Sequence, residues 1–266
     1  MSEKHKPFNI ERIRNAVQQL SRDSQGTKIS FFESINSTNA WLLENGQCGD
    51  ICLSEMQTAG RGRRDNNWVS PGSGNIYLSY CCCFDDSVKH RSLLGLVTGI
   101  AIAEALADIG LSGHGIKWPN DIFWGNKKLG GVLIQTSNQS DKFIIGIGLN
   151  LSLPNSCYNE ITQAAVSLED AMQGELFSRD DLLIQLIRQL TLQLNKFEQI
   201  TFNDFKHSWN KWDILRGKHV SFQHHNSLIT GKVEELDTHG RLGIANATGV
   251  LEYFSSAEIK LQKAST

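Results

Sequence analysis

Three arginines lie among glycines in the segment from Gln57 to Trp68, which reads QTAGRGRRDNNW. Their planar guanidinium groups carry paired N–H donors that suit the oxygens of a carboxylate or a phosphate. We expect Gly60 and Gly62 to adopt positive φ angles and to let the backbone approach a ligand closely. This pattern predicts an anion-binding loop. A solvated basic loop and an arginine patch for nucleic acid are the alternatives, and the segment alone leaves both open.

A second candidate is Lys117, which precedes Trp118 and Pro119 in the sequence KWPND. It closes an apolar stretch and comes directly before a turn whose backbone the proline restricts. A lysine held there can stabilise developing negative charge with little reorganisation. A surface lysine whose stem lies on apolar atoms is the alternative for Lys117 taken alone. Together with the arginine loop, Lys117 predicts a site that handles anions.

Signatures of several common sites are missing from the sequence. It contains neither a GxxxxGK[ST] phosphate loop nor a complete GxGxxG motif, and HExxH and GxSxG are also absent. Cys48 and Cys52 have no second pair of ligands to complete a tetrahedral zinc site, so we expect no structural metal. Cys81, Cys82 and Cys83 are consecutive and alternate in direction along a strand. We therefore expect reduced, structural thiols rather than a disulfide framework.

The composition is that of an ordinary globular protein. The 266 residues are 40% hydrophobic and 20% charged, with a formal net charge of -2. No global field therefore recruits nucleic acid or anionic lipid, and we expect neither as a partner. No apolar run is long enough to cross a membrane, and the N-terminal segment has no signal-peptide pattern. We therefore expect a cytoplasmic protein that makes no membrane contact.

The elements that must position the two segments follow from apolar periodicity and turn residues. The N-terminal half is predicted to contain a short amphipathic helix at 9–21, strands at 28–35, 50–56 and 75–84, a helix that starts within 36–45, and a core helix at 91–110. The middle of the chain is predicted to form short β segments at 114–124, 127–137 and 142–153. A helix capped by Ser178 and a further helix ending near Trp212 follow. Four short strands beyond Leu215 predict a small β-barrel, and the overall order favours an antiparallel or mixed sheet.

Five segments, taken in order and at their intervals, resemble the biotin protein ligase family. They are SINSTN (34–39), QTAGRGRR (57–64), KWPND (117–121), KKLGGVLIQ (127–135) and GIGLNL (146–151). The resemblance covers nearly the whole chain, from about Lys28 through the C-terminal β module. GRGRR and KWPND together make it specific.

The resemblance implies an α+β fold. It has a mixed or antiparallel β-sheet with packed helices, as in class II aminoacyl-tRNA synthetases and biotin ligases, and a small C-terminal SH3-like β-barrel. The implied organisation is a short helical segment at 1–27, a catalytic domain at 28–214 and the barrel at 215–266. Some members carry an N-terminal winged helix that represses genes, but the stretch before residue 28 is too short for such a unit. We therefore expect the form without that domain.

The resemblance also implies an ATP-dependent biotin–protein ligase. Such an enzyme joins biotin to AMP using ATP and Mg²⁺, and then passes biotin to a lysine of a biotin carboxyl carrier protein domain of acetyl-CoA carboxylase. A homodimer is possible because the edge strands of a mixed sheet can pair. The preferred carrier and the ligands of Mg²⁺ do not follow from the sequence.

Site residues follow from matching the motifs. Lys117 and Arg63 would be catalytic: Lys117 would contact the biotin carboxylate and the α-phosphate, and Arg63 would retain the mixed anhydride. The biotin-binding residues would be Ser37, Thr38, Asn39, Gln57, Arg61, Gly62, Arg63, Lys117 and Gly131. The residues that bind ATP or the adenylate would be Arg63, Arg64, Trp68, Asn120, Lys128 and Asn150. Without the resemblance, Ser37 would be a helix cap, Trp68 a core aromatic and Asn150 a turn residue.

The chain departs from the family pattern at three positions. Asp65 replaces the usual glycine after GRGRR, which adds a negative charge near the expected phosphate and predicts weaker adenylate retention. Gln135 stands where glutamate is common, and Gly130 where alanine is frequent. These two departures concern local electrostatics and stiffness.

Two other functions are compatible with the sequence. A lipoate or octanoyl transferase of related fold is the enzymatic alternative, which the ligand that supports pyrophosphate exchange would distinguish. A biotin-sensing module without turnover is the other alternative, and it would form no adenylate with MgATP.

Overall fold

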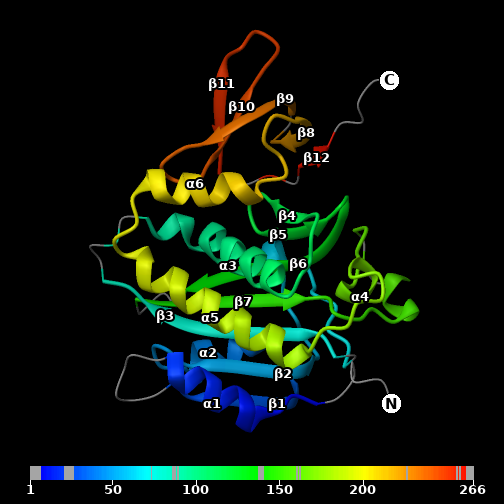
Figure 1. Ribbon diagram of the computed structural model, residues 1–266. Helices are drawn as coiled ribbons and strands as arrows, with labels where there is room; N and C mark the ends of the chain where they lie inside the picture. The colour runs from blue at the N-terminus through cyan, green and yellow to red at the C-terminus, as the bar shows by residue number, and fades with distance from the viewer. Residues whose placement is uncertain are drawn as a thin grey trace.

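The chain folds into a larger mixed α/β unit and a smaller β unit (Figure 1). A computed structural model describes residues 7–20, 27–72, 74–85, 88, 90–136, 141–159, 161, 163–225, 227–255, 257 and 259–261. Among these residues, no helix combines the length and the apolar composition that a membrane span needs.

The larger unit is built on a seven-stranded sheet with the order β1-β2-β3-β7-β6-β5-β4. Its first pair, β1 and β2, is parallel because helix α2 crosses between them, and every other pair is antiparallel. The predicted mixed sheet is therefore confirmed. The strands are β1 (Ile29–Ile35), β2 (Ile51–Gln57), β3 (Ile76–Cys83), β4 (His114–Lys117), β5 (Asp121–Trp124), β6 (Lys127–Thr136) and β7 (Lys142–Leu149).

The helices cover both faces of this sheet. The predicted core helix is α3 (Leu94–Asp108), most of whose residues are buried, and it lies beside α5 (Arg179–Phe197) in Figure 1. On the other face, α2 (Thr38–Asn45) packs through Leu42 on Cys52 of β2. The neighbours of Cys52 in β2 belong to the main core, because alternate residues of a strand point to opposite faces. The remaining helices among the described residues are α1 (Ile10–Leu20), α4 (Leu168–Ala171), α6 (Phe202–Trp212) and the short 3₁₀ segments η2 (Arg63–Asp65), η3 (Arg91–Leu93) and η4 (Asn155–Asn159).

The smaller unit is an antiparallel sheet with the order β11-β10-β9-β8-β12. Its four longer strands confirm the predicted C-terminal β module, whereas the two-residue strand β12 was not predicted. Closure of this sheet into an SH3-like barrel stays a prediction, as does the domain boundary at 215. The strands are β8 (His219–His224), β9 (Ser227–Leu236), β10 (Leu242–Ala245), β11 (Leu251–Phe254) and β12 (Lys260–Leu261).

The small sheet is attached directly to the KWPND turn. The indole N–H of Trp118 donates a hydrogen bond of 2.9 Å to the carbonyl oxygen of Gly240, in the turn between β9 and β10. Gly240 packs so closely on Leu93 and Leu96 that an added Cβ would lie 2.7 Å from Leu93. Because Trp118 is itself buried, the turn that follows Lys117 is held between the two units.

The prediction of six reduced cysteines is wrong for one pair. Cys48 and Cys83 form a disulfide, with their Cα atoms 5.6 Å apart. The fold brings the loop after α2 against the end of β3, where the N–H of Gly49 donates to the carbonyl oxygen of Cys81. Cys52, Cys81, Cys82 and Cys157 remain free and buried, as predicted, and burial raises the pKa of the Cys52 thiol to about 12.

Candidate functional site

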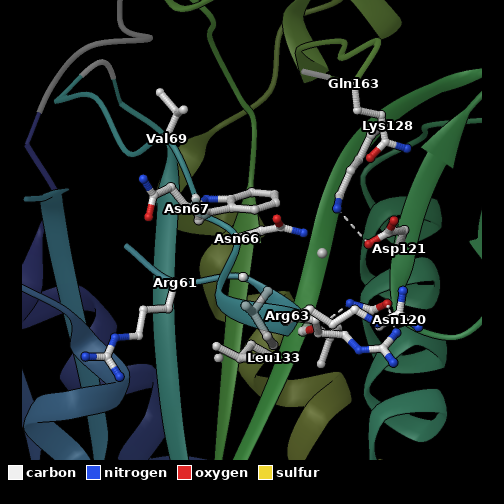
Figure 2. A pocket seen from close by; sticks show the side chains of 18 of the residues that line it. Arg61, Arg63, Asn66, Asn67, Val69, Asn120, Asp121, Lys128, Leu133 and Gln163 are labelled. Atoms are coloured by element: carbon white, nitrogen blue, oxygen red, sulfur yellow. Dashed lines mark hydrogen bonds and ion pairs between the residues drawn. The ribbon is translucent and has the colours of Figure 1, made fainter. Parts of the chain in front are cut away.

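A cavity of about 490 Å³ lies over the middle of the large sheet, between the arginine loop and the KWPND turn. Segments separated by more than a hundred residues in the sequence meet in its wall, as the close-up in Figure 2 shows. All fourteen predicted site residues line it, namely Ser37, Thr38, Asn39, Gln57, Arg61, Gly62, Arg63, Arg64, Trp68, Lys117, Asn120, Lys128, Gly131 and Asn150. The tertiary structure therefore gathers every one of them at one place.

The arginine loop is a compact hairpin rather than an open chain. The N–H of Trp68 donates to the carbonyl oxygen of Gly60 at 3.0 Å, and the N–H of Gly62 donates to that of Asn66 at 2.7 Å. An added Cβ at Gly60 would lie 2.5 Å from the carbonyl oxygen of Trp68, so close backbone approach does require glycine there. The predicted positive φ angles are wrong for Gly60 and Gly62. The left-handed residue is Arg64, with a φ of 55°, since it occupies the tight turn of the hairpin.

Arg63 joins the hairpin to the KWPND turn. Its Nη1 donates a hydrogen bond of 2.8 Å to Oδ1 of Asn120, whose Nδ2 in turn donates to the carbonyl oxygen of Val132 on β6. Burial and the neighbouring Arg64 lower the pKa of the Arg63 guanidinium, which nevertheless stays protonated because its ordinary pKa is so high. Arg61 leaves the hairpin in a different direction from Arg63 (Figure 2). Arg61 and Arg63 therefore place positive charge at two separate parts of the cavity wall.

Lys117 is the last residue of β4 and lies opposite Asp121 in the β4–β5 pair. Its Nζ lies 4.8 Å from the centre of the Phe123 ring. A cation against an aromatic face is stabilised without losing its charge. The strand end and this ring together hold the ammonium group at the cavity wall.

Trp68 packs on a glycine floor made of Gly131 and Gly148. Gly131 of β6 and Gly148 of β7 are paired across the sheet, and an added Cβ would lie 3.4 Å from the indole at Gly131 and 2.5 Å from it at Gly148. The Nζ of Lys128 lies 5.2 Å from a Trp68 ring centre and 2.7 Å from Oδ1 of Asp121, the pair joined in Figure 2. The indole of Trp68 fits at this position because neither Gly131 nor Gly148 carries a side chain.

Replacing Gly148 by alanine is expected to displace Trp68 and to weaken ligand retention in the cavity. The new methyl group would overlap the ring, since real Cβ contacts essentially never fall below 3.0 Å. We expect at least an about 10-fold higher dissociation constant for the nucleotide, because a large aromatic contact is lost, and quenching of Trp68 fluorescence by a ligand should weaken. Gly95→Ala is the matched control, because its Cβ would meet Ile134 at an ordinary 3.7 Å. Unchanged ligand affinity in Gly148→Ala would contradict this role of the glycine floor.

The first turn of α2 supplies the amide and hydroxyl wall. Ser37 is the N-cap of α2, with its Oγ accepting from the N–H of Ala40, so the helix-cap alternative describes Ser37 correctly even though it lines the cavity. Gln57 accepts from the N–H of Thr38 through its Oε1 at 2.9 Å. Asn39 and Asn150 are both buried. These polar groups are available for a ligand that itself carries donors and acceptors.

Sequence reasoning missed several residues that line the cavity. Asp121 belongs to the KWPND motif but had been given no role, although it is the ion-pair partner of Lys128. Ala257 and Ile259 come from the C-terminal unit, and no local pattern could have placed them beside a segment near residue 60. The side chain of Asp65, the departure from the family pattern, lies outside the described part of the structure.

Comparison with known proteins agrees with this geometry. The chain matches the Biotin/lipoate A/B protein ligase family over residues 31–152. It is 31% identical over 254 residues to the bifunctional ligase/repressor BirA of Escherichia coli, covering 93% of this chain and 78% of that protein. It is also 29% identical over 167 residues to the biotin–[acetyl-CoA-carboxylase] ligase of Mycobacterium tuberculosis, covering 59% of this chain and 60% of that protein.

A solved structure shows the same fold. The biotin protein ligase of Aquifex aeolicus in complex with biotin and ATP superposes with a TM-score of 0.76 at 29% identity, covering 89% of this chain and 99% of that one. Because sequence identity, coverage and fold agree, the chain belongs to the biotin protein ligases, within the Biotin/lipoate A/B protein ligase family.

Proposed function

We propose that the cavity activates biotin with MgATP and transfers it to a lysine of a biotin carboxyl carrier domain. In the first step a carboxylate oxygen of biotin attacks the α-phosphorus of ATP, and the bond to pyrophosphate breaks. In the second step the ε-amine of the acceptor lysine attacks the acyl carbon, loses a proton and releases AMP. The observation that carries the proposal is the Arg63–Asn120 hydrogen bond, which ties the arginine hairpin to the turn that follows Lys117 within one cavity.

The polar wall at the N-terminus of α2 is proposed to hold the ring end of biotin. Ser37, Thr38 and Asn39 are buried and present hydroxyl and amide groups to the cavity. Gln57, Gly62 and Gly131 would line the path of the acyl tail, and Arg61 would close over it. A site that pairs each polar group of a substrate discriminates against analogues that lack those groups.

Lys117 and Arg63 are proposed to bring the two anions together. A biotin carboxylate and an ATP α-phosphate repel each other, so fixed cations between them lower the barrier to attack. Arg63 and Arg64 would then retain the mixed anhydride, and Trp68 would shield it from water. Asn120, Lys128 and Asn150 would contact the nucleotide.

Mg²⁺ would enter with the nucleotide. Among the described residues that line the cavity, Asp121 is the one carboxylate, and Lys128 already neutralises it. Mg²⁺ is usually held by one or two carboxylates together with substrate phosphates rather than by an all-protein cage. This wall fits such a shared arrangement: Asp121 would help to hold the ion, and the ion would offset negative charge on the phosphates.

The acceptor is proposed to be the carrier domain of acetyl-CoA carboxylase. The support is the name of the Mycobacterium tuberculosis relative, a biotin–[acetyl-CoA-carboxylase] ligase.

We also propose that residues 28–214 form the catalytic domain and that residues 215–266 form a separate module. Ala257 and Ile259 of that module complete the cavity wall.

Incubation of the chain with biotin, MgATP and a purified carrier domain tests the proposal. We expect the mass of the carrier to rise by that of one biotinyl group. We also expect biotin, and not lipoate, to support pyrophosphate exchange. Lipoate is the matched control substrate. Labelling by lipoate in place of biotin would assign the chain to the other branch of its family, and biotin binding without exchange would make it a sensor rather than a ligase.

A further inference from the structure

We propose that Ser79 and Gln135 are positioning residues that hold the Asn39 amide in place, and that the amide held there selects a cyclic urea. The inference deepens the proposed function and rests on it. Neither residue belongs to the fourteen residues predicted to bind ligand, and Ser79 does not line the cavity. Both act through Asn39, which is 4% exposed at the cavity wall.

Ser79 contacts the oxygen of the amide. Its Oγ lies 2.5 Å from Oδ1 of Asn39 and 2.7 Å from Oγ1 of Thr38. A hydroxyl has one proton and an amide oxygen cannot donate. With the amide oxygen toward it, Ser79 gives its proton to Asn39 and accepts that of Thr38, so the 3.1 Å contact between Oγ1 of Thr38 and Oε1 of Gln57 then carries no proton. Ser79 is fully buried, so no water competes for this arrangement.

Gln135 fixes the nitrogen of the same amide. Nδ2 of Asn39 donates a hydrogen bond of 2.8 Å to Oε1 of Gln135, which comes from β6. Ser79 comes from β3, so the two contacts reach the amide from different strands. An amide flipped by 180° could still donate to Ser79, since the proton of Ser79 can go to Thr38 and that of Thr38 to Gln57. Its oxygen would face Oε1 of Gln135, however, and the flipped state would lose that hydrogen bond, at about 1 kcal/mol or more for a buried group.

A glycine leaves the space in which the amide lies. Gly146 of β7 is paired with Ser79 across the sheet, and an added Cβ there would lie 2.4 Å from Oδ1 of Asn39. Ser79 and Gln135 thus contact the amide from two sides, and Gly146 lies beneath it. It cannot move toward the sheet without overlapping β7.

The network continues to the arginine hairpin. Gln57 accepts from the N–H of Thr38 and donates through Nε2 to Oγ of Ser70 at 3.1 Å. The hydroxyl of Ser70 donates to the carbonyl oxygen of Trp68 at 2.9 Å. One connected set of hydrogen bonds therefore runs from β6 to the end of the hairpin.

The consequence is a fixed pair of ligand groups. Asn39 has two amide protons and about two acceptor positions. Gln135 uses one proton and Ser79 uses one acceptor position, which leaves one donor and one acceptor side by side. A cyclic urea has a carbonyl next to N–H groups and can satisfy both. The dithiolane ring of lipoate carries no comparable pair, so it would leave both groups of Asn39 unpaired.

Steady-state kinetics of Gln135→Met and Ser79→Ala test the proposal. We expect each change to raise KM for biotin by about 10-fold, because a freed amide loses roughly one hydrogen bond with the ligand. KM for ATP should stay within about 2-fold, since the nucleotide does not contact Asn39 in the proposed arrangement. Gln135→Glu should restore the wild-type KM for biotin, because a carboxylate oxygen accepts the same N–H.

Gln189→Met is the matched control. Gln189 also donates a side-chain hydrogen bond, to Asp108, but far from the cavity. Gln135 is only half buried, so Gln135→Met is expected to fold even if Ser79→Ala does not. Discrimination against lipoate should fall in Gln135→Met and in Ser79→Ala but not in Gln189→Met. It is measured as the ratio of kcat/KM for biotin to kcat/KM for lipoate.

Three results would overturn the proposal. The first is an unchanged KM for biotin in Gln135→Met with wild-type thermal unfolding. The second is an equal rise in KM for biotin and for ATP, and the third is a failure of Gln135→Glu to restore the KM for biotin. Either of the last two would mean that the network only supports the fold. A wild-type chain that does not label the carrier with biotin would instead refute the proposed function, so the two failures are distinguishable.

Discussion

Replacing Lys117 by alanine is expected to lower the rate of adenylate formation by about 10²–10³-fold, the usual cost of removing one preorganised group that stabilises a transition state. The ammonium group lies at the cavity wall at the end of β4, held against Phe123. Without it, two anions would have to approach each other with one fixed cation fewer. The loss should appear in kcat as well as in kcat/KM, because the charge develops in the transition state.

Biotin-dependent pyrophosphate exchange measures this step without the carrier. Lys127→Ala is the control, because Lys127 is exposed and does not line the cavity. The unfolding temperature of Lys117→Ala should stay close to that of the wild type, since Lys117 ends a strand and is not part of the apolar core. Wild-type exchange in a folded Lys117→Ala protein would remove Lys117 from the mechanism.

The second large effect is expected for Arg63→Ala, which should release the adenylate about 10–100-fold faster. The change removes a charged hydrogen-bonding group, and such bonds contribute about 1.5–3 kcal/mol. It also removes the contact with Asn120 that joins the hairpin to the opposite wall. A released acyl adenylate reacts with any exposed amine, so indiscriminate lysine labelling should rise.

A bystander protein added to the reaction reports this leakage, and a chase with unlabelled biotin reports the dissociation rate. Arg188→Ala is the matched control, because Arg188 is an exposed arginine of α5 away from the cavity. An Arg63→Ala protein that labels the carrier but leaves the bystander unlabelled would show that adenylate retention depends on other groups.

Local patterns predicted the elements well. The cap residue Ser178, the apolar faces of α3 and α5 and the alternation in β3 depend on neighbours within a few residues, and the structure confirms these elements. The short 3₁₀ segments η2 to η4 and the strand β12 were missed because they are too short to show a period. The positive φ was assigned to glycines by residue type, whereas the hairpin geometry places it at Arg64.

The sequence by itself determined the chemistry of the site. The arginine loop, KWPND and the glycine pairs of β6 and β7 are contiguous motifs, so their residue types could be recognised without coordinates. Only the tertiary structure decided which of these groups meet. The Arg63–Asn120 bond, the glycine floor beneath Trp68, the Cys48–Cys83 disulfide and the ordered contacts of Ser79 and Gln135 with Asn39 all join residues far apart in the chain. Contacts of this kind depend on strand order and register, which follow from burial of the whole core and not from any local pattern.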